Sequence, residues 1–93
     1  MQIRSLGNAL DDLVQKLGIG NRLAEYEAVT RWEDIVGEQI ARVTTAKRID
    51  KGVLVVAVNN GPWRNELNLM KAEIIWKINA ALGSKPVKDI RFV

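Results

Sequence analysis

Apolar residues recur every three or four positions near the start of the chain, which is the period of an amphipathic helix. This spacing predicts a helix over residues 5–17, with Ser5 suited to its N-cap and Gly18 to its end. The apolar stripe of this helix comprises Leu6, Leu10, Leu13, Val14 and Leu17.

A second helical repeat predicts a helix over residues 22–36, and Asn21 is able to cap its first turn. Its apolar face comprises Ala28, Val29, Trp32, Ile35 and Val36. Glu27 and Arg31 lie one turn apart on the opposite face, where a pair of opposite charges supports a helix.

The period changes after residue 41, where β-branched residues follow one another without a helical stripe. Residues 42–49 are therefore predicted to form a strand, and the unbroken apolar run of residues 53–58 is the strongest strand of the chain. Between them, Asp50-Lys51-Gly52 predicts a three-residue turn with a positive φ at Gly52. The expected result is an antiparallel β-hairpin over residues 42–59.

A long helix is predicted over residues 62–82, because Asn60 or Gly61 suits its cap, Pro62 suits its first turn and Gly83 suits its end. Its main apolar face comprises Trp63, Leu67, Met70, Ile74, Ile78 and Ala81. Residues 87–93 then predict a last strand.

The predicted element order is therefore ααββαβ over one domain, residues 1–93. This order indicates the α+β class, with a small three-stranded sheet packed by helices.

Two large apolar residues of the third predicted helix, Leu69 and Trp76, lie off its main apolar stripe. A helix with two apolar faces is either enclosed by other elements or presents one face to a partner. Leu69 and Trp76 are therefore a candidate partner interface, including one between copies of this chain. Trp32 and Trp63 lie on main apolar faces and are predicted to be core residues.

Composition narrows the chemistry, because the chain contains no cysteine and no histidine. The absence of cysteine excludes a thiol nucleophile and a cysteine-containing zinc site. The absence of histidine removes the residue most used for proton transfer near neutral pH. The glycines do not form a phosphate-binding motif, and no spacing of acidic residues suggests a metal site. We therefore predict a protein that is not an enzyme, with no catalytic, cofactor or metal residues.

The net charge of +3 conceals an uneven distribution. Residues 1–41 carry four Lys or Arg against seven Asp or Glu, whereas residues 42–93 carry ten against four. This excess favours a polyanion partner for the second half. The candidate nucleic-acid-binding residues are Arg42, Lys47, Arg48, Lys51, Arg64, Lys71, Lys88 and Arg91. With no apolar run of membrane-spanning length and no signal peptide expected, a cytoplasmic location without a membrane partner is the default.

A family resemblance rests on residues spread over most of the chain. The series begins with Trp32-x-x-Ile35-Val36-Gly37, Ile40-Ala41, Thr44 and Gly52-Val53-Leu54-x-Val56-x-Val58, and it continues with Trp63-x-x-Glu66-Leu67-x-x-x-Lys71, Ile78-Asn79 and Val87-Lys88-Asp89-Ile90-Arg91-Phe92. In these positions the chain resembles the DciA-type proteins, with the sharpest matches between Trp32 and Phe92.

The resemblance implies a KH-like fold and a bacterial DNA-replication protein that contacts DNA and assists loading of the replicative helicase, DnaB. The GxxG loop of KH domains is absent from the sequence, so clamping of a sugar–phosphate backbone by that loop is not expected. Two other functions remain open at the level of sequence: a general RNA-binding KH-like module and a small homo-oligomeric adaptor.

Overall fold

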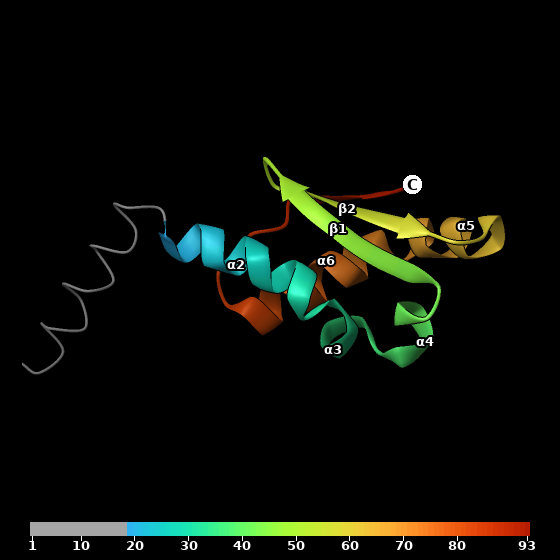
Figure 1. The fold of residues 1–93 in the computed structure, drawn as a ribbon, viewed down its shortest axis with the longest axis horizontal. Coiled ribbons are helices and arrows are strands. Elements are labelled where there is room, and N and C mark those ends of the chain that lie inside the picture. The colour runs from blue at the N-terminus through green and yellow to red at the C-terminus, as the bar shows by residue number, and fades with distance from the viewer. Residues whose placement is uncertain (1–18) are drawn as a thin grey trace, which may run out of the picture.

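The computed structural model describes residues 19–93, so the helix predicted over residues 5–17 lies outside the described part of the chain. The elements in order are α2 (Ile19–Thr30), α3 (Trp32–Val36), α4 (Glu38–Ala41), β1 (Thr44–Asp50), β2 (Val53–Val58), α5 (Gly61–Leu69), α6 (Lys71–Leu82) and β3 (Asp89–Phe92). Figure 1 shows α5 and α6 behind the sheet and α2 running along its β1 side. The α+β class and the helices-then-strands order predicted from sequence are confirmed.

The sheet is mixed and has the order β1-β2-β3. β1 and β2 are antiparallel, and β2 and β3 are parallel. The first and last strands thus belong to one sheet but lie on opposite sides of β2. The predicted strand at residues 53–58 has the same bounds as β2, whereas the other two predicted strands were each about two residues too long at their first ends.

The hairpin turn contains two residues and not the three that were predicted. Asp50 pairs with Val53, so only Lys51 and Gly52 lie in the loop, with φ angles of 52° and 84°. Positive φ at both positions is typical of a type I′ turn, whose twist matches that of the strands it joins. Gly52 adopts this conformation without the strain of a side chain, as the sequence predicted.

A β-bulge at Lys47 controls which side chains of β1 face the helices. Ala46 pairs with Val56 and Arg48 pairs with the next residue of β2, Val55, so Lys47 is an extra residue on β1. The extra residue allows two consecutive basic residues to stay exposed while the half-buried Ala46 and Ile49 both pack against the core.

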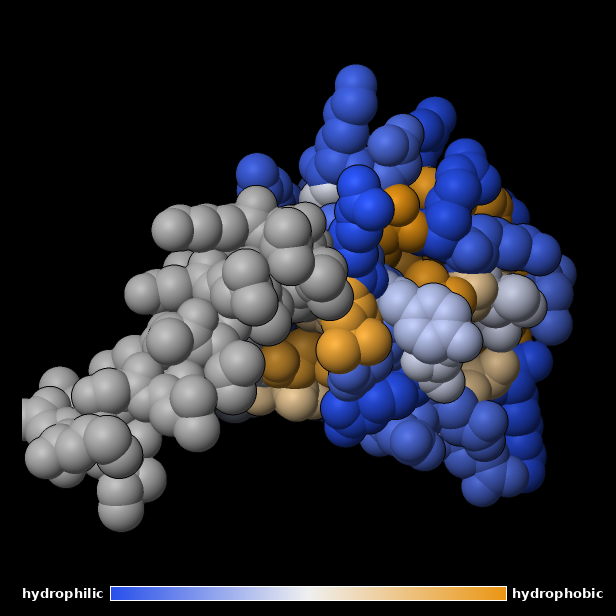
Figure 2. Space-filling model, turned by 60° about the vertical axis from the view of Figure 1, so that its left-hand side comes forward, coloured by the Kyte–Doolittle hydropathy of each residue, from blue (hydrophilic) through white to orange (hydrophobic). Residues whose placement is uncertain are grey.

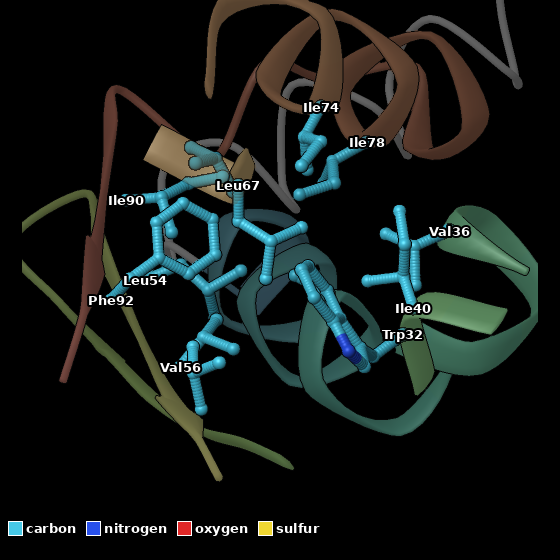
Figure 3. Close-up of a cluster of buried hydrophobic side chains, with 13 residues drawn as sticks. Trp32, Val36, Ile40, Leu54, Val56, Leu67, Ile74, Ile78, Ile90 and Phe92 are labelled. Atoms are coloured by element: carbon cyan, nitrogen blue, oxygen red, sulfur yellow. The ribbon is translucent and has the colours of Figure 1, made fainter. Parts of the chain in front are cut away.

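The core lies between the sheet and the helices. Leu54, Val56 and Val58 of β2 are buried, and Figure 3 shows Leu54 and Val56 beside Ile90 and Phe92 of β3. The helices contribute Ala28, Trp32, Val36, Ile40, Leu67, Ile74 and Ile78. The apolar stripes predicted for the second and third helices are therefore largely confirmed, except that Ala81 is exposed and Leu82 packs against the core in its place.

Both predicted helices from this part of the chain are interrupted. The helix expected over residues 22–36 is divided at Arg31 into α2 and α3, and α2 begins at Ile19. The helix expected over residues 62–82 is divided at Met70, whose φ and ψ of −94° and 4° lie outside the helical range. The Met70 N–H donates to the carbonyls of both Leu67 and Glu66, so the backbone tightens for one turn and then continues as a helix.

Side-chain hydrogen bonds hold the ends of these elements. The Asn60 Oδ1 atom accepts a bond from the backbone N–H of Trp63 at 2.9 Å, which caps α5 as predicted. The side chain of Asn79 on α6 both donates to the Val87 carbonyl and accepts from the Val87 N–H, at 2.9 and 3.1 Å. This reciprocal pair fixes the segment that leads into β3 and so helps to place β3 beside β2.

Candidate nucleic-acid interface

The face of the sheet opposite the core carries two arginines on either side of one valine. Val55 of β2 pairs with Arg48 of β1 and with Arg91 of β3, so these three residues form a row across all three strands. Residues paired in this way project on the same side of a sheet. We call this row and the face on which it lies the open sheet face. Arg48 and Arg91 are both exposed.

Val55 is only 8% exposed although it is not a member of the core cluster. Directly opposed residues in a sheet lie close enough for long side chains to cover a neighbour. The aliphatic parts of Arg48 and Arg91 are placed to do this, while their guanidinium groups remain in water. The arginines therefore lie on an apolar strip and are not isolated surface charges.

Two lysines extend the positive charge at the hairpin end of the sheet. Lys51 lies in the turn, and Lys88 precedes β3 and donates its backbone N–H to the Gly52 carbonyl at 2.8 Å. The stem of Lys88 lies against Gly52, because a Cβ atom on that glycine would be only 2.9 Å from Lys88 Cδ. The absence of a side chain at residue 52 thus lets Lys88 pack against the turn.

Acidic residues lie at the same end of the sheet. Asp50 and Asp89 are the two cross-strand partners of Val53, in the row next to that of the arginines. Asp89 accepts from the Ile90 N–H at 2.8 Å, and its Oδ1 lies 3.5 Å from the Lys71 ammonium. The two carboxylates thus lie on the same face as Arg48 and Arg91, each two residues along the strand from one of the arginines.

Three of the basic residues singled out from the sequence have other contacts. Arg42 ends α4 and is not on the first strand as predicted, and its guanidinium lies 2.6 Å from Glu38. Arg64 on α5 is half-buried and donates to the Val58 carbonyl at 3.2 Å, where it holds the end of β2. Lys71 begins α6 and pairs with Asp89.

A groove between α2 and β1 contains residues that the sequence analysis did not single out. It has a volume of about 380 Å³ and is lined by Arg22, Glu25, Tyr26, Val29, Lys47, Arg48 and Ile49. Arg22, Tyr26 and Val29 recur at helical spacing on one face of α2. The spacing could have shown that these three residues share one face of a helix. Nothing in the sequence showed that β1 would pack against this face.

Leu69 and Trp76 are exposed, at 84% and 70% of their surfaces. Leu69 is the last residue of α5 and Trp76 lies in the middle of α6, so the interruption at Met70 separates them. Trp63, in contrast, is half-buried against the core. The sequence placed Leu69 and Trp76 off the main apolar stripe, and both side chains are indeed exposed to solvent in the described part of the fold.

No group of three or more His, Cys, Asp or Glu side chains in residues 19–93 lies close enough together to hold a metal ion. None of the helices in this part of the chain is long and apolar enough to span a membrane. What the open sheet face offers is two arginines on an apolar strip, an arrangement suited to binding an extended anion.

The fold and this surface define a small α+β protein with a three-stranded mixed sheet whose outward face carries a row with two arginines. The chain belongs to the DciA family: the family described as Dna[CI] antecedent, DciA, matches residues 5–92. It is 32% identical over 88 residues to a UPF0232 protein of Mycolicibacterium smegmatis, a match that covers 95% of this chain and 45% of that protein. It is 34% identical over 86 residues to the UPF0232 protein of Mycobacterium tuberculosis strain H37Rv, covering 92% of this chain and 46% of that one. The chain thus spans less than half the length of these relatives, and the resemblance seen in the sequence is confirmed.

Proposed function

We propose that this protein is a non-enzymatic accessory factor of DNA replication that binds DNA and assists loading of the replicative helicase, DnaB. Membership in the DciA family supports the replication role. The observation that carries the DNA-binding part is the row of Arg48, Val55 and Arg91 across the open sheet face.

The geometry of this row suits a phosphate backbone. Neighbouring strands lie about 4.8 Å apart, so the Cα atoms of Arg48 and Arg91 are separated by about 10 Å across the sheet. Each guanidinium is able to bind a phosphate through two parallel hydrogen bonds, and the pairing of both arginines with Val55 sets the spacing between them. The strands carry no exposed aromatic ring on this face for bases to stack on, so this contact is largely independent of base sequence.

Helicase docking is assigned to the exposed apolar residues on the other side of the fold. Trp76 belongs to α6, whose buried residues Ile74 and Ile78 face the core, so its own side chain projects away from the sheet. Tryptophan is among the residues that contribute most to binding energy at protein interfaces. Leu69, exposed at the end of α5, is the second candidate residue for this contact. DNA and helicase would thus occupy different surfaces.

The test is a titration of labelled single-stranded and duplex DNA by fluorescence anisotropy over a series of salt concentrations. We expect the affinity to fall steeply with salt, because binding of phosphates releases counterions. Arg48→Gln combined with Arg91→Gln should weaken binding and flatten the slope. The matched control is Arg31→Gln combined with Lys77→Gln, which removes the same charge from two exposed positions outside the sheet, one between α2 and α3 and one on α6. A flat salt profile, or equal loss in both double variants, contradicts the proposal.

The alternatives have distinct outcomes in the same set of measurements. Tighter binding of structured RNA than of either DNA at every salt concentration would favour a general RNA-binding module. Retention of all binding activities when Arg42, Lys47, Arg48 and Lys51 are changed to Glu would favour an adaptor in which these charges play no part. A pull-down with the purified helicase, with and without nuclease, tests the helicase contact and shows whether DNA bridges it.

A further inference from the structure

We propose that the groove between α2 and β1 is a binding site for one unstacked base of single-stranded DNA, with Tyr26 as the stacking residue. This inference rests on the proposed DNA binding and adds to it a site, a residue and a strand preference. None of the three follows from the open sheet face, which has cations but no exposed aromatic ring.

The lining of the groove has the three parts that such a site needs. Its floor is apolar, because Val29 of α2 and Ile49 of β1 are half-buried against the core. Its wall includes the phenol ring of Tyr26, which is 65% exposed and so keeps most of its surface available to a ligand. Among the described residues that line the groove, Arg22, Lys47 and Arg48 are cations and Glu25 is a carboxylate, so this part of the lining has an excess of positive charge.

The size of the groove fits a small planar ligand. Its volume of about 380 Å³ lies within the range of about 300–1,000 Å³ that is typical of small-molecule sites. Figure 2 views the molecule with its α2 end brought forward and shows apolar surface exposed between hydrophilic side chains. An apolar floor with charged edges is suited to a nucleobase whose phosphate stays at the rim.

The groove is continuous with the open sheet face, because Arg48 belongs to both. A line of cations therefore leads from Arg91 on β3 to Arg48 on β1 and on to Arg22 on α2. The bulge at Lys47 adds one more cation where this line passes over the edge of the sheet. A backbone that follows this line would bring a base beside Tyr26.

Strand preference follows from the aromatic ring. Bases in a duplex are already stacked on one another, so the face of a base is accessible to a side chain only in single-stranded nucleic acid. The contacts at Arg48 and Arg91 bind phosphates of either form. Tyr26 should therefore contribute to binding of single strands and not of duplexes.

The test compares oligo(dT) with a DNA duplex of matched charge, using the full chain. We expect Tyr26→Leu to weaken oligo(dT) binding by about tenfold, as removal of a base-stacking side chain does. The duplex affinity and the salt slope should not change, because no charge is lost. Tyr26→Phe should bind as the original protein does, since it keeps the ring. Leu23→Ala is the matched control, because Leu23 is 54% exposed on the same helix but does not line the groove.

A second measurement does not depend on affinity. Light-induced crosslinking of an oligonucleotide that contains 5-iodouracil, followed by mass spectrometry, should place the attachment at Tyr26. If Tyr26→Leu leaves oligo(dT) binding unchanged, or weakens duplex binding equally, the groove is not a base site. The proposed function still stands in that case, provided that Arg48→Gln with Arg91→Gln weakens both DNAs. If the unaltered chain binds neither DNA, both proposals are wrong.

Discussion

The indole N–H of Trp32 donates a hydrogen bond to the hydroxyl oxygen of Thr44 at 2.8 Å. The Thr44 hydroxyl in turn donates to the carbonyl of Ile40 at 2.7 Å. The two bonds join α3, the end of α4 and the start of β1. The first bond satisfies the one polar atom of the Trp32 side chain, a residue that is only 4% exposed. The chain therefore turns from helix to sheet at a point fixed by one hydroxyl group.

Replacement of Thr44 by Val should destabilise the fold by about 1–3 kcal/mol, because valine keeps the shape but leaves the buried indole N–H without an acceptor. Thr44→Ser keeps the hydroxyl and should cost less. Urea unfolding followed by tryptophan fluorescence measures both. A larger loss for Thr44→Ser than for Thr44→Val would show that the methyl group, and not the hydrogen bond, is what matters.

Trp63 and Trp76 should differ in their effects on stability. Trp63 is half-buried against the core, so Trp63→Ala should cost about 2 kcal/mol or more through lost packing. Trp76→Ala should change the free energy of unfolding by about 0.5 kcal/mol or less, because the side chain is 70% exposed. It should nevertheless weaken capture by the helicase or change self-association. Equal large falls in melting temperature would show instead that Trp76 is a structural residue.

Gly52 and Gly83 allow the cost of a positive φ to be separated from the cost of crowding. Both have positive φ angles, 84° and 73°, but only at Gly52 would an added Cβ meet another side chain, the stem of Lys88. Gly83→Ala should therefore cost about 1 kcal/mol, as a strained backbone alone does. Gly52→Ala should cost more and should displace Lys88. A smaller loss at residue 52 than at residue 83, measured by thermal unfolding, would contradict this account.

Substitution of Arg64 should affect the stability of the fold, whereas substitution of Arg91 should affect DNA binding. The Arg64 guanidinium donates to the Val58 carbonyl, so Arg64→Gln should lower the free energy of unfolding by about 1 kcal/mol and leave the salt slope of DNA binding unchanged. Arg91→Gln should leave stability within about 0.5 kcal/mol and reduce the slope by about 0.7 on single strands, the value for one phosphate contact. The opposite pattern would mean that Arg64 binds DNA.

Local sequence was sufficient to predict most of the secondary structure. The bounds of β2 follow from one run of six apolar residues, and the capping role of Asn60 and the positive φ of Gly52 follow from residue types whose backbone preferences are strong. The interruption at Met70 was not predictable in this way. The apolar stripe continues from Leu67 through Met70 to Ile74, and no proline or glycine marks the change.

The sequence by itself determined the chemistry available: no thiol, no imidazole, and a second half rich in lysine and arginine. Which of those charges act together was decided only by the tertiary structure. Arg48 and Arg91 are 43 positions apart and meet across Val55 because β3 pairs with β2 in parallel, a long-range contact that no local pattern encodes. Arg42 and Arg64 look equivalent to them in the sequence, yet one pairs with Glu38 and the other supports the end of β2. Tyr26 joins the basic residues of β1 for the same reason, because packing and not sequence spacing brings α2 against that strand.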